Sequence, residues 1–351
     1  MSQRPDTLWY TRSSIPTPLG IGAQLGLYQR EFSPDGITIK SLQESRDPAE
    51  QASHFEHTLP HSFRLGGAVP PIWARAKGQD TRVIGISWID EYQTILALPQ
   101  SGIDSPKDLK GRRVGLPRRS DRSDSVDVAR ASALRGFLVA LELAGLKQHD
   151  VQWVDIAGRQ TADANQVAAP DTSVRRRNPH SYTEAALALV RGEVDAIYVK
   201  DVRGAETAHL LGAKVVLDLG FHPDPYVRIN NCAPRPLTVN TSTLKEHPEL
   251  VRRFLKRVVE VGSWARQNPS AALTQIAAET NWTAPWVRFA YGDNVHESLG
   301  VDLSEHSIWG LTVFKDFLLH HGFLNADFNI RDWIDPAPLQ SLQPQTELIA
   351  A

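Results

Sequence analysis

The stretch Asp108-Leu109-Lys110-Gly111-Arg112-Arg113-Val114-Gly115-Leu116 turns at its first glycine and then becomes apolar, which predicts a buried strand over residues 112–116. An amphipathic helix is predicted over residues 126–144, with Gly145 closing it. A further strand is predicted over residues 151–156. Strand, helix and strand in this order are typical of an α/β fold, since the helix carries the chain back to the start of the next parallel strand.

The same alternation extends on both sides of this unit. Further strands are predicted at residues 7–10, 37–42, 82–88, 92–98, 196–199, 214–217 and 237–240. Further helices are predicted at residues 19–30, 49–63, 72–76, 182–191, 205–211, 248–267, 269–278, 284–291 and 306–320. A chain of 351 residues suits two lobes better than one core. We therefore predict a discontinuous first lobe, residues 1–99 and 221–351, and an inserted second lobe, residues 100–220, with a ligand cleft between them that closes by hinge motion.

Composition excludes several classes of protein. The formal net charge of −2 gives no general attraction to nucleic acid or to an anionic membrane, and the basic runs near residues 112–122 and 175–177 have aspartates beside them. No apolar run approaches the roughly 18 residues of a membrane span. The single cysteine, Cys232, allows neither an intramolecular disulfide nor a thiolate metal site. The N-terminal residues have no secretory apolar region, so we expect the cytoplasm as the compartment. We also expect a monomer. Residues 157–180 show no periodicity and form either a lid or a merely mobile loop.

Three separated side chains near the start of the chain suggest a reaction centre for an anion: Ser13, His54 and Arg64. The planar fork of an arginine matches a two-oxygen anion with two parallel hydrogen bonds. Gly66 and Gly67 follow it, and glycines let backbone N–H groups approach an oxyanion with no Cβ in the way. From composition alone, an arginine followed by two glycines more often forms a surface ion pair and a tight turn.

His54 has two alternative roles. It titrates near neutral pH and can relay a proton to or from Ser13, or it can simply pack on its helix. His54, His57 and His61 also stand at i, i+3 and i+7, which is a possible metal spacing. We predict no metal there, because no carboxylate shares that face and Pro60 disturbs the helix. A serine nucleophile needs an adjacent base, and no third, orienting acid is evident.

Aromatic residues around these positions could line a pocket for a ring. Tyr10 and Phe63 adjoin the three-residue group, and Tyr198 lies with Lys200 and Asp201 at the end of a strand, where ligands of α/β sheets bind. Each aromatic taken alone is more often a core residue. Cys232 follows two asparagines without any matching histidine motif, and we interpret it as structural.

Several phrases resemble the aliphatic-sulfonate and taurine type of periplasmic solute-binding protein. They are Gly67-Ala68-Val69-Pro70-Pro71-Ile72, the stretch from Asp108 to Gly115, Ala144-Gly145-Leu146 and Val190-Arg191-Gly192-Glu193-Val194-Asp195-Ala196. The resemblance covers most of residues 60–220. It implies a two-lobed, periplasmic-binding-protein-like α/β fold of type II with a central ligand cleft, and it says little about the ligand.

A narrower resemblance is to the 2'-hydroxybiphenyl-2-sulfinate desulfinase family, which has the same fold. The family pattern Tyr-x-x-Cys-x-x-Pro reads Tyr10-Thr11-Arg12-Ser13-Ser14-Ile15-Pro16 here. The second pattern begins with His-Phe and has an arginine ten positions after the histidine, then one residue, then Gly-Gly. Here it is matched by His54-Phe55, Arg64 and Gly66-Gly67. The resemblance implies that Arg64 and the Gly67 amide hold a sulfinate and that His54 contacts the catalytic residue.

Two positions depart from that family. Its reactive residue is a cysteine, whereas this chain has Ser13, and Leu59 replaces a polar amide. The serine is either a laboratory substitution or the mark of a natural relative with different or no chemistry. A hydroxyl stays protonated where a thiol ionises, so slow turnover or none is expected from Ser13.

These observations predict a desulfinase-like protein that binds an aryl sulfinate and cleaves its C–S bond hydrolytically, releasing sulfite without a cofactor. The alternative is a solute-binding protein that delivers a sulfonate, taurine or a similar anion to a transporter. A catalytically silent ligand sensor is a third class.

Overall fold

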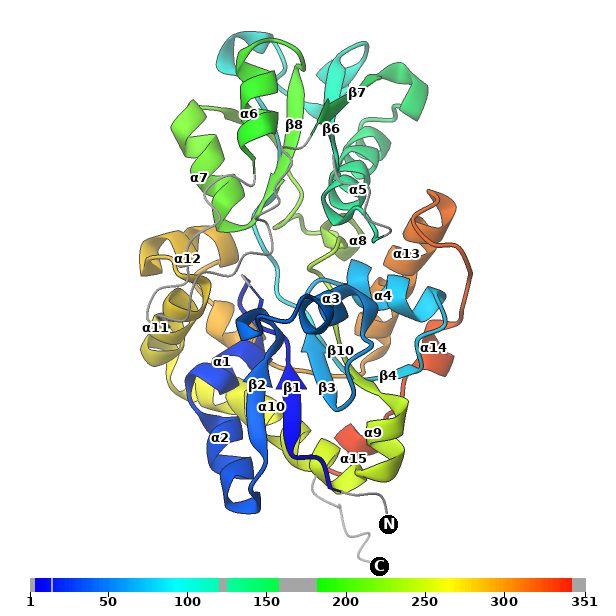
Figure 1. Ribbon diagram of the computed structural model, residues 1–351. Coiled ribbons are helices and arrows are strands. Elements are labelled where there is room, and N and C mark those ends of the chain that lie inside the picture. Colours follow the sequence, from blue (N-terminus) through cyan, green and yellow to red (C-terminus); the bar gives the residue numbers. More distant parts are fainter. Residues whose placement is uncertain (1–3, 14, 120–124, 158–181, 343–351) are drawn as a thin grey trace, which may run out of the picture.

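The computed structural model describes residues 4–13, 15–119, 125–157 and 182–342, and it contains two five-stranded sheets stacked end to end (Figure 1). The first sheet has the order β2-β1-β3-β10-β4 and is parallel except for β10. Its strands are β1 Thr7–Tyr10, β2 Thr38–Ser41, β3 Ser62–Leu65, β4 Thr81–Ser87 and β10 Arg235–Asn240. The predicted α/β fold class is confirmed.

The second sheet has the order β7-β6-β8-β5-β9. Its strands are β5 Gln93–Ala97, β6 Arg113–Arg118, β7 Gln152–Ala157, β8 Ala196–Lys200 and β9 Lys214–Asp218. Strands β6, β7 and β8 are parallel, and β5 runs antiparallel to β8 and β9. Every residue of β3 and β5 is buried, as expected for strands covered by helices on both faces.

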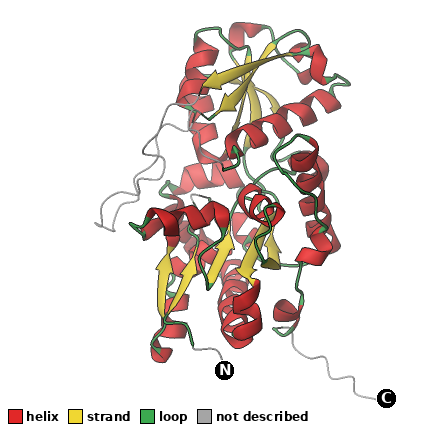
Figure 2. Ribbon diagram, turned by 45° about the vertical axis from the view of Figure 1, so that its right-hand side comes forward, coloured by secondary structure: helices red, strands yellow, loops and turns green. Residues whose placement is uncertain are grey.

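Helices cover both faces of each sheet (Figure 2). In the first lobe they are α1 Pro18–Gln24, α2 Leu27–Phe32, α3 Pro48–Glu56, α4 Val69–Ala76, α9 Thr241–Glu246, α10 Pro248–Gln267, α13 Glu305–His320, α14 Ile330–Trp333 and α15 Ala337–Gln340. In the second lobe they are α5 Val128–Leu143, α6 Thr183–Val190 and α7 Asp201–Leu211. Helices α8 Pro225–Arg228, α11 Pro269–Thr280 and α12 Ala284–Tyr291 lie in the segment that returns to the first lobe.

The core of the first lobe lies between its sheet and α10. Phe254 of α10 stacks on Phe63 of β3 with ring centroids 3.8 Å apart and on Tyr28 of α2 at 4.4 Å. The opposite face of the sheet packs against α4, α13 and α14, with Trp333 fully buried there. Burial of this aromatic area stabilises the lobe.

The chain crosses between the sheets after β4 and again between β9 and β10. The two crossing segments touch at Gly220, where a Cβ atom would lie 1.8 Å from the carbonyl oxygen of Glu91, so only glycine fits. Strand β5 joins the second sheet ahead of residue 100, where we placed the first lobe boundary. The boundaries 99/100 and 220/221 stay a prediction.

Two helix predictions were wrong in their extent. The helix predicted over residues 19–30 is two helices, because Gly26 takes a left-handed φ of 66° between them. The helix predicted over residues 49–63 ends at Glu56, where His57 has a φ of 52°, and residues 62–65 form β3 instead. Pairing with β1 and β10 outweighs local helical character there. The loop predicted over residues 157–180 lies, apart from Ala157, outside the described residues.

Candidate functional site

The candidate site lies where the two lobes meet. The carboxyl ends of the parallel strands β1, β3 and β4 and the amino end of antiparallel β10 share one edge of the first sheet. Ser13, Arg64, Glu91 and Arg235 lie on or just beyond these strand ends. The carboxyl end of β8 brings Lys200 from the second lobe, beside the first crossing segment. Strand ends of this kind are where α/β sheets bind their ligands.

Arg64 is buried, with 1% of its surface exposed, and is only partly satisfied. Its Nε donates to the His54 carbonyl oxygen at 3.0 Å and its Nη1 to the Gly67 carbonyl oxygen at 3.0 Å. Its Nη2 has no hydrogen-bond partner, and no carboxylate of the described residues pairs with it. Burial lowers the pKa of Arg64 to about 9, so the guanidinium is still charged at neutral pH. A buried cation with an unused donor can bind an anion.

Gly66 and Gly67, which follow Arg64, differ in what a Cβ atom would contact at each position. A Cβ atom on Gly67 would lie 2.5 Å from Nδ2 of Asn231, so this glycine makes room for the asparagine amide. Asn231 in turn accepts a hydrogen bond from the Val69 amide at its Oδ1, 2.9 Å away. A Cβ atom on Gly66 would lie 3.8 Å from both Arg64 Nη2 and Ser13 Oγ. Gly66 therefore faces the same space as the unused arginine donor and the serine hydroxyl.

Ser13 is held by a loop that is anchored on both sides. Its Oγ accepts a hydrogen bond from the Ile15 amide at 3.5 Å. The preceding Arg12 donates through its backbone amide to Gln43 Oε1 at 2.5 Å and through its guanidinium to buried Glu279. These bonds fix the loop that carries the hydroxyl toward Gly66.

His54 lies in the last turn of α3, enclosed by protein on most sides although part of it reaches solvent. Its Nδ1 is 3.4 Å from Nε2 of Gln43, whose Oε1 accepts the Arg12 amide, so Gln43 links the histidine to the serine loop. Burial, together with the charges of Arg64 and His57, lowers the pKa of His54 to about 3. The imidazole is therefore neutral at neutral pH.

Cys232 lies in the same neighbourhood, which the sequence analysis did not anticipate. The thiol is 3% exposed, and its Sγ accepts from Lys200 Nζ at 3.0 Å and from Asn231 Nδ2 at 3.6 Å. Lys200 also donates to Glu91 Oε1 at 2.9 Å. Although burial opposes its charge, Cys232 and Glu91 raise the pKa of Lys200 well above its usual value.

Arg235 closes these contacts into a ring. It is fully buried, lies 3.5 Å from Glu91 Oε2, and donates through Nη1 to the Pro16 carbonyl oxygen at 2.7 Å, next to the serine loop. The polar ring is then formed by Ser13, Arg64, Gly66, Gly67, Asn231, Cys232, Lys200, Glu91 and Arg235. Within it, three cations face one carboxylate, and three buried atoms have no hydrogen-bond partner among the residues that the structure describes: Arg64 Nη2, Glu91 Oε2 and Arg235 Nε. This charge balance suits an anionic ligand.

Three predicted ligand-lining aromatics are instead part of the core or its hydrogen bonds, which corrects the expectation for them. Side chains alternate along β3, so Phe63 faces Phe254 on the side of the sheet opposite Arg64. Tyr10, paired with Phe63 in register, is 4% exposed and packs toward Tyr28. The Tyr198 hydroxyl bridges Gln93 and Asn230, each at 3.0 Å.

The three histidines do not share a helix face. Only His54 is helical, because His57 ends α3 and His61 lies beyond it with a φ of 54°. His57 contacts the Ser62 carbonyl oxygen at 3.3 Å and Thr238 at 3.4 Å, while His61 contacts Thr243 at 3.2 Å. Among the described residues no group of three histidine, cysteine, aspartate or glutamate side chains is placed to hold a metal.

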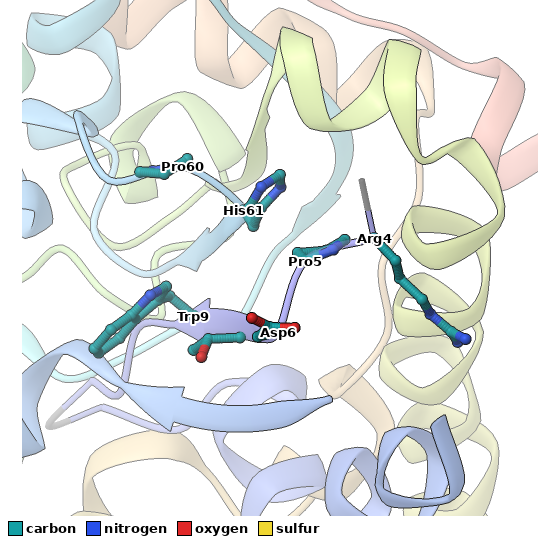
Figure 3. Close-up of a pocket in the computed structure, with 7 residues that line it drawn as sticks. Arg4, Pro5, Asp6, Trp9, Pro60 and His61 are labelled. Carbon is teal, nitrogen blue, oxygen red and sulfur yellow. The ribbon is translucent and has the colours of Figure 1, made fainter. Parts of the chain in front are cut away.

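An open pocket of about 400 Å³ lies at the opposite edge of the first sheet (Figure 3). Residues Arg4 to Thr7, Trp9, Pro60 and His61 line it at the amino ends of β1 and β3. The polar ring lies at the carboxyl ends of the same strands, so this pocket is separate from it. Arg4 there is paired with Asp35.

Comparison with known proteins agrees with the resemblance found in the sequence. Residues 69–169 match the family described as NMT1/THI5 like. A 2'-hydroxybiphenyl-2-sulfinate desulfinase from Rhodococcus erythropolis is 26% identical over 94% of this chain and 92% of the relative, and one from Rhodococcus qingshengii matches equally well. The chain is a homologue of these desulfinases.

Solved structures give the same result. The desulfurisation enzyme DszB superposes with a TM-score of 0.74 at 25% identity, over 96% of this chain and 98% of DszB. A cysteine-to-serine mutant of DszB, in complex with biphenyl-2-sulfinic acid, has a TM-score of 0.73 over 96% of this chain and 99% of its own. The periplasmic aliphatic sulphonate binding protein SsuA from Escherichia coli, at 18% identity, has a TM-score of 0.65 over 95% of this chain and 92% of its own, which shows a shared fold. The expected periplasmic-binding-protein-like architecture is confirmed.

The residues of the polar ring that the sequence had singled out lie in the first lobe, and their role in binding stays a prediction. Ser13, Arg64 and Gly66 are brought together around one point, and His54 is joined to Arg64 and Gln43. Glu91, Asn231, Cys232 and Arg235 were missed, because each lies on a crossing segment or strand start with no local motif. The one available signal was the position of Lys200 at a strand end.

Proposed function

We propose that this protein binds an aryl sulfinate in the polar ring and hydrolyses its C–S bond, releasing sulfite. The observation that carries the proposal is the buried guanidinium of Arg64 with one donor unused, in a chain homologous over nearly its whole length to sulfinate desulfinases. A sulfinate offers two oxygens with one negative charge, which matches the arginine fork.

The residues have distinct roles in this proposal. Arg64 binds the sulfinate oxygens, with Arg235 and Lys200 adding positive charge around them. The amide N–H of Gly67 is assigned to the same oxygens. Ser13 flanks the head group, and neutral His54 orients the loop through Gln43. The net reaction takes up one water and gives the arene and bisulfite.

The decisive experiment measures sulfite release and binding separately. The protein is incubated with 2'-hydroxybiphenyl-2-sulfinate while sulfite is measured, and affinity for the corresponding uncleavable sulfonate is measured by calorimetry. We expect binding and measurable sulfite release, both reduced about hundredfold in Arg64→Gln. Ser13→Cys tests whether a thiol at position 13 raises the rate.

The outcomes separate the functions. Absence of both binding and release, in the wild type and in Ser13→Cys, refutes the desulfinase proposal. Binding without release in either would favour a sulfonate-binding role.

We also propose that the protein acts as a monomer in the cytoplasm, which sedimentation and cell fractionation test. Within the described residues, no helix is both long enough and apolar enough to cross a membrane.

A further inference from the structure

We propose that Cys232, rather than Ser13, supplies the proton that replaces the sulfinyl group on the aromatic carbon. This inference rests on the proposed function, since it assigns one step of that reaction to a residue. Cys232 is the only cysteine of the chain, so any thiol chemistry of the protein must occur there.

Position alone distinguishes this thiol from an ordinary core cysteine. A buried cysteine in an apolar core has no polar neighbours, whereas Sγ of Cys232 lies 3.0 Å from an ammonium and 3.6 Å from an amide NH₂ group. The segment that carries it crosses between the lobes, next to the point where the lobe II residue Lys200 reaches the first crossing segment.

A second, independent observation marks the place as a ligand site. Arg64 Nη2 is an unpartnered donor on a side chain that is 1% exposed, and it lies beside Gly66. From there the contacts run through Gly67 to Asn231, whose amide fills the space left by the missing Cβ and donates to Cys232. The thiol and the unused guanidinium donor are thus joined through one asparagine.

The thiol is suited to be an acid whose conjugate base is stabilised in advance. Burial, and then the charge of Glu91, raises the pKa of Cys232, so the thiol carries its proton at neutral pH. Once the proton has left, the thiolate is held by Lys200 at 3.0 Å and by Asn231. Lys200 stays cationic for this purpose because Glu91 pairs with it at 2.9 Å. Such fixed charges aimed at a developing anion lower the barrier without reorganisation.

The step balances without a cofactor. The ring π electrons form the new C–H bond with the thiol proton at the carbon that bears sulfur. The C–S bond then breaks, its electron pair restores the aromatic ring, and the sulfur leaves as sulfur dioxide. Water adds to sulfur dioxide to give bisulfite and a proton, which restores the Cys232 thiol. No group is oxidised or reduced by a partner outside the site.

The test compares Cys232→Ala with Ser13→Ala. We expect kcat for sulfite release to fall at least hundredfold in Cys232→Ala and less than tenfold in Ser13→Ala, while affinity for the uncleavable sulfonate changes less than fivefold in Cys232→Ala. Lys200→Met should lower kcat at least tenfold. Lys315→Met is its matched control and should keep the wild-type rate, because Lys315 is another buried lysine, paired with Asp316 and Asp327.

A readout on the unmutated protein covers the case in which a variant fails to fold. Alkylation of the only thiol by iodoacetamide should be slowed at least tenfold by the bound sulfonate. Wild-type kcat should also fall at high pH as the thiol ionises, and this limb should be absent in Cys232→Ser.

The outcomes that overturn the inference are distinct from those that overturn the function. Sulfite release by the wild type that survives in Cys232→Ala, or alkylation unaffected by the bound sulfonate, refutes the role of Cys232 alone. Failure of the wild type to bind or release refutes the proposed function and this inference together.

Discussion

Two arginines at the same edge of the first sheet, the half-buried Arg12 and the buried Arg64, differ in their hydrogen-bond partners. Arg12 meets the carboxylate of Glu279, itself fully buried, with Nη2 2.5 Å from Oε2 and Nε 3.3 Å from Oε1. Although burial alone opposes its charge, this pairing raises the pKa of Arg12 above its usual value. Among the described residues, Arg64 donates to two carbonyl oxygens, and burial lowers its pKa to about 9.

The difference separates an arginine that pairs with a carboxylate of the fold from the arginine that we propose binds the ligand. A buried ion pair holds two segments, here residues 11–13 and α11, in one arrangement. A buried cation without a counterion costs free energy to fold, and strain of this kind is characteristic of binding sites. The unused donor of Arg64 is consistent with the ligand-binding role proposed above, whereas the guanidinium of Arg12 is paired with Glu279.

The largest expected effect is on stability, in Arg12→Met. Removal of the guanidinium leaves Glu279 buried without its cation, and we expect the free energy of unfolding to fall by about 3–5 kcal/mol. Urea denaturation measures this. The double variant Arg12→Met/Glu279→Met should recover most of the loss, and a single variant within about 1 kcal/mol of wild type would contradict the structural role of the pair.

Arg64→Met should weaken ligand binding more than it destabilises the fold. We expect affinity for biphenyl-2-sulfonate to fall about hundredfold, equivalent to about 3 kcal/mol, because two charge-assisted hydrogen bonds are lost. The loss of unfolding free energy should be smaller than in Arg12→Met. Calorimetry of both variants checks the contrast, with Arg64→Lys as the control that keeps the charge and loses the fork. Equal affinity in Arg64→Met and wild type would remove Arg64 from the site.

Gly66 and Gly67 should differ in a similar way, one affecting ligand binding and the other affecting stability. Gly67→Ala places a Cβ 2.5 Å from the Asn231 amide, so we expect a loss of about 1–3 kcal/mol in unfolding free energy. Gly66→Ala meets only ordinary contacts at 3.8 Å and should change stability by less than about 1 kcal/mol, while its methyl group weakens sulfonate binding. Thermal unfolding and calorimetry measure the two effects. Equal destabilisation by both variants would show that the Asn231 contact is not what requires glycine.

The smallest expected effect is a pH dependence of binding. An anion binds the charged form of Arg64, whose pKa in the free protein is about 9. Affinity for the sulfonate should therefore be flat with respect to this group below about pH 8, and fall as the pH rises through 9, approaching tenfold per pH unit, or about 1.4 kcal/mol. Titrations between pH 7 and 10.5 test this. If the decline is equally steep in Arg64→Met, another group causes it.

Local patterns predicted the site only as far as one lobe. The spacing of Arg64 to its two glycines lies within four residues, so the sequence shows it directly. The prediction for Phe63 failed because its face depends on β3, and the same residues had been assigned to a helix. Cys232 was interpreted as structural because no histidine motif accompanies it. Its partner Lys200, which in turn pairs with Glu91, is distant in the sequence, so no local pattern shows this contact.

By itself, the sequence determined the alternation of strands and helices, the two lobes and the arginine with its glycines, because periodicity and short spacing are local properties of a chain. The tertiary structure alone decided which buried charges find partners. Arg12 pairs with the carboxylate of Glu279, more than two hundred residues away in the chain, whereas no carboxylate of the described residues pairs with Arg64. The same long-range packing brought the single thiol to the ammonium of Lys200.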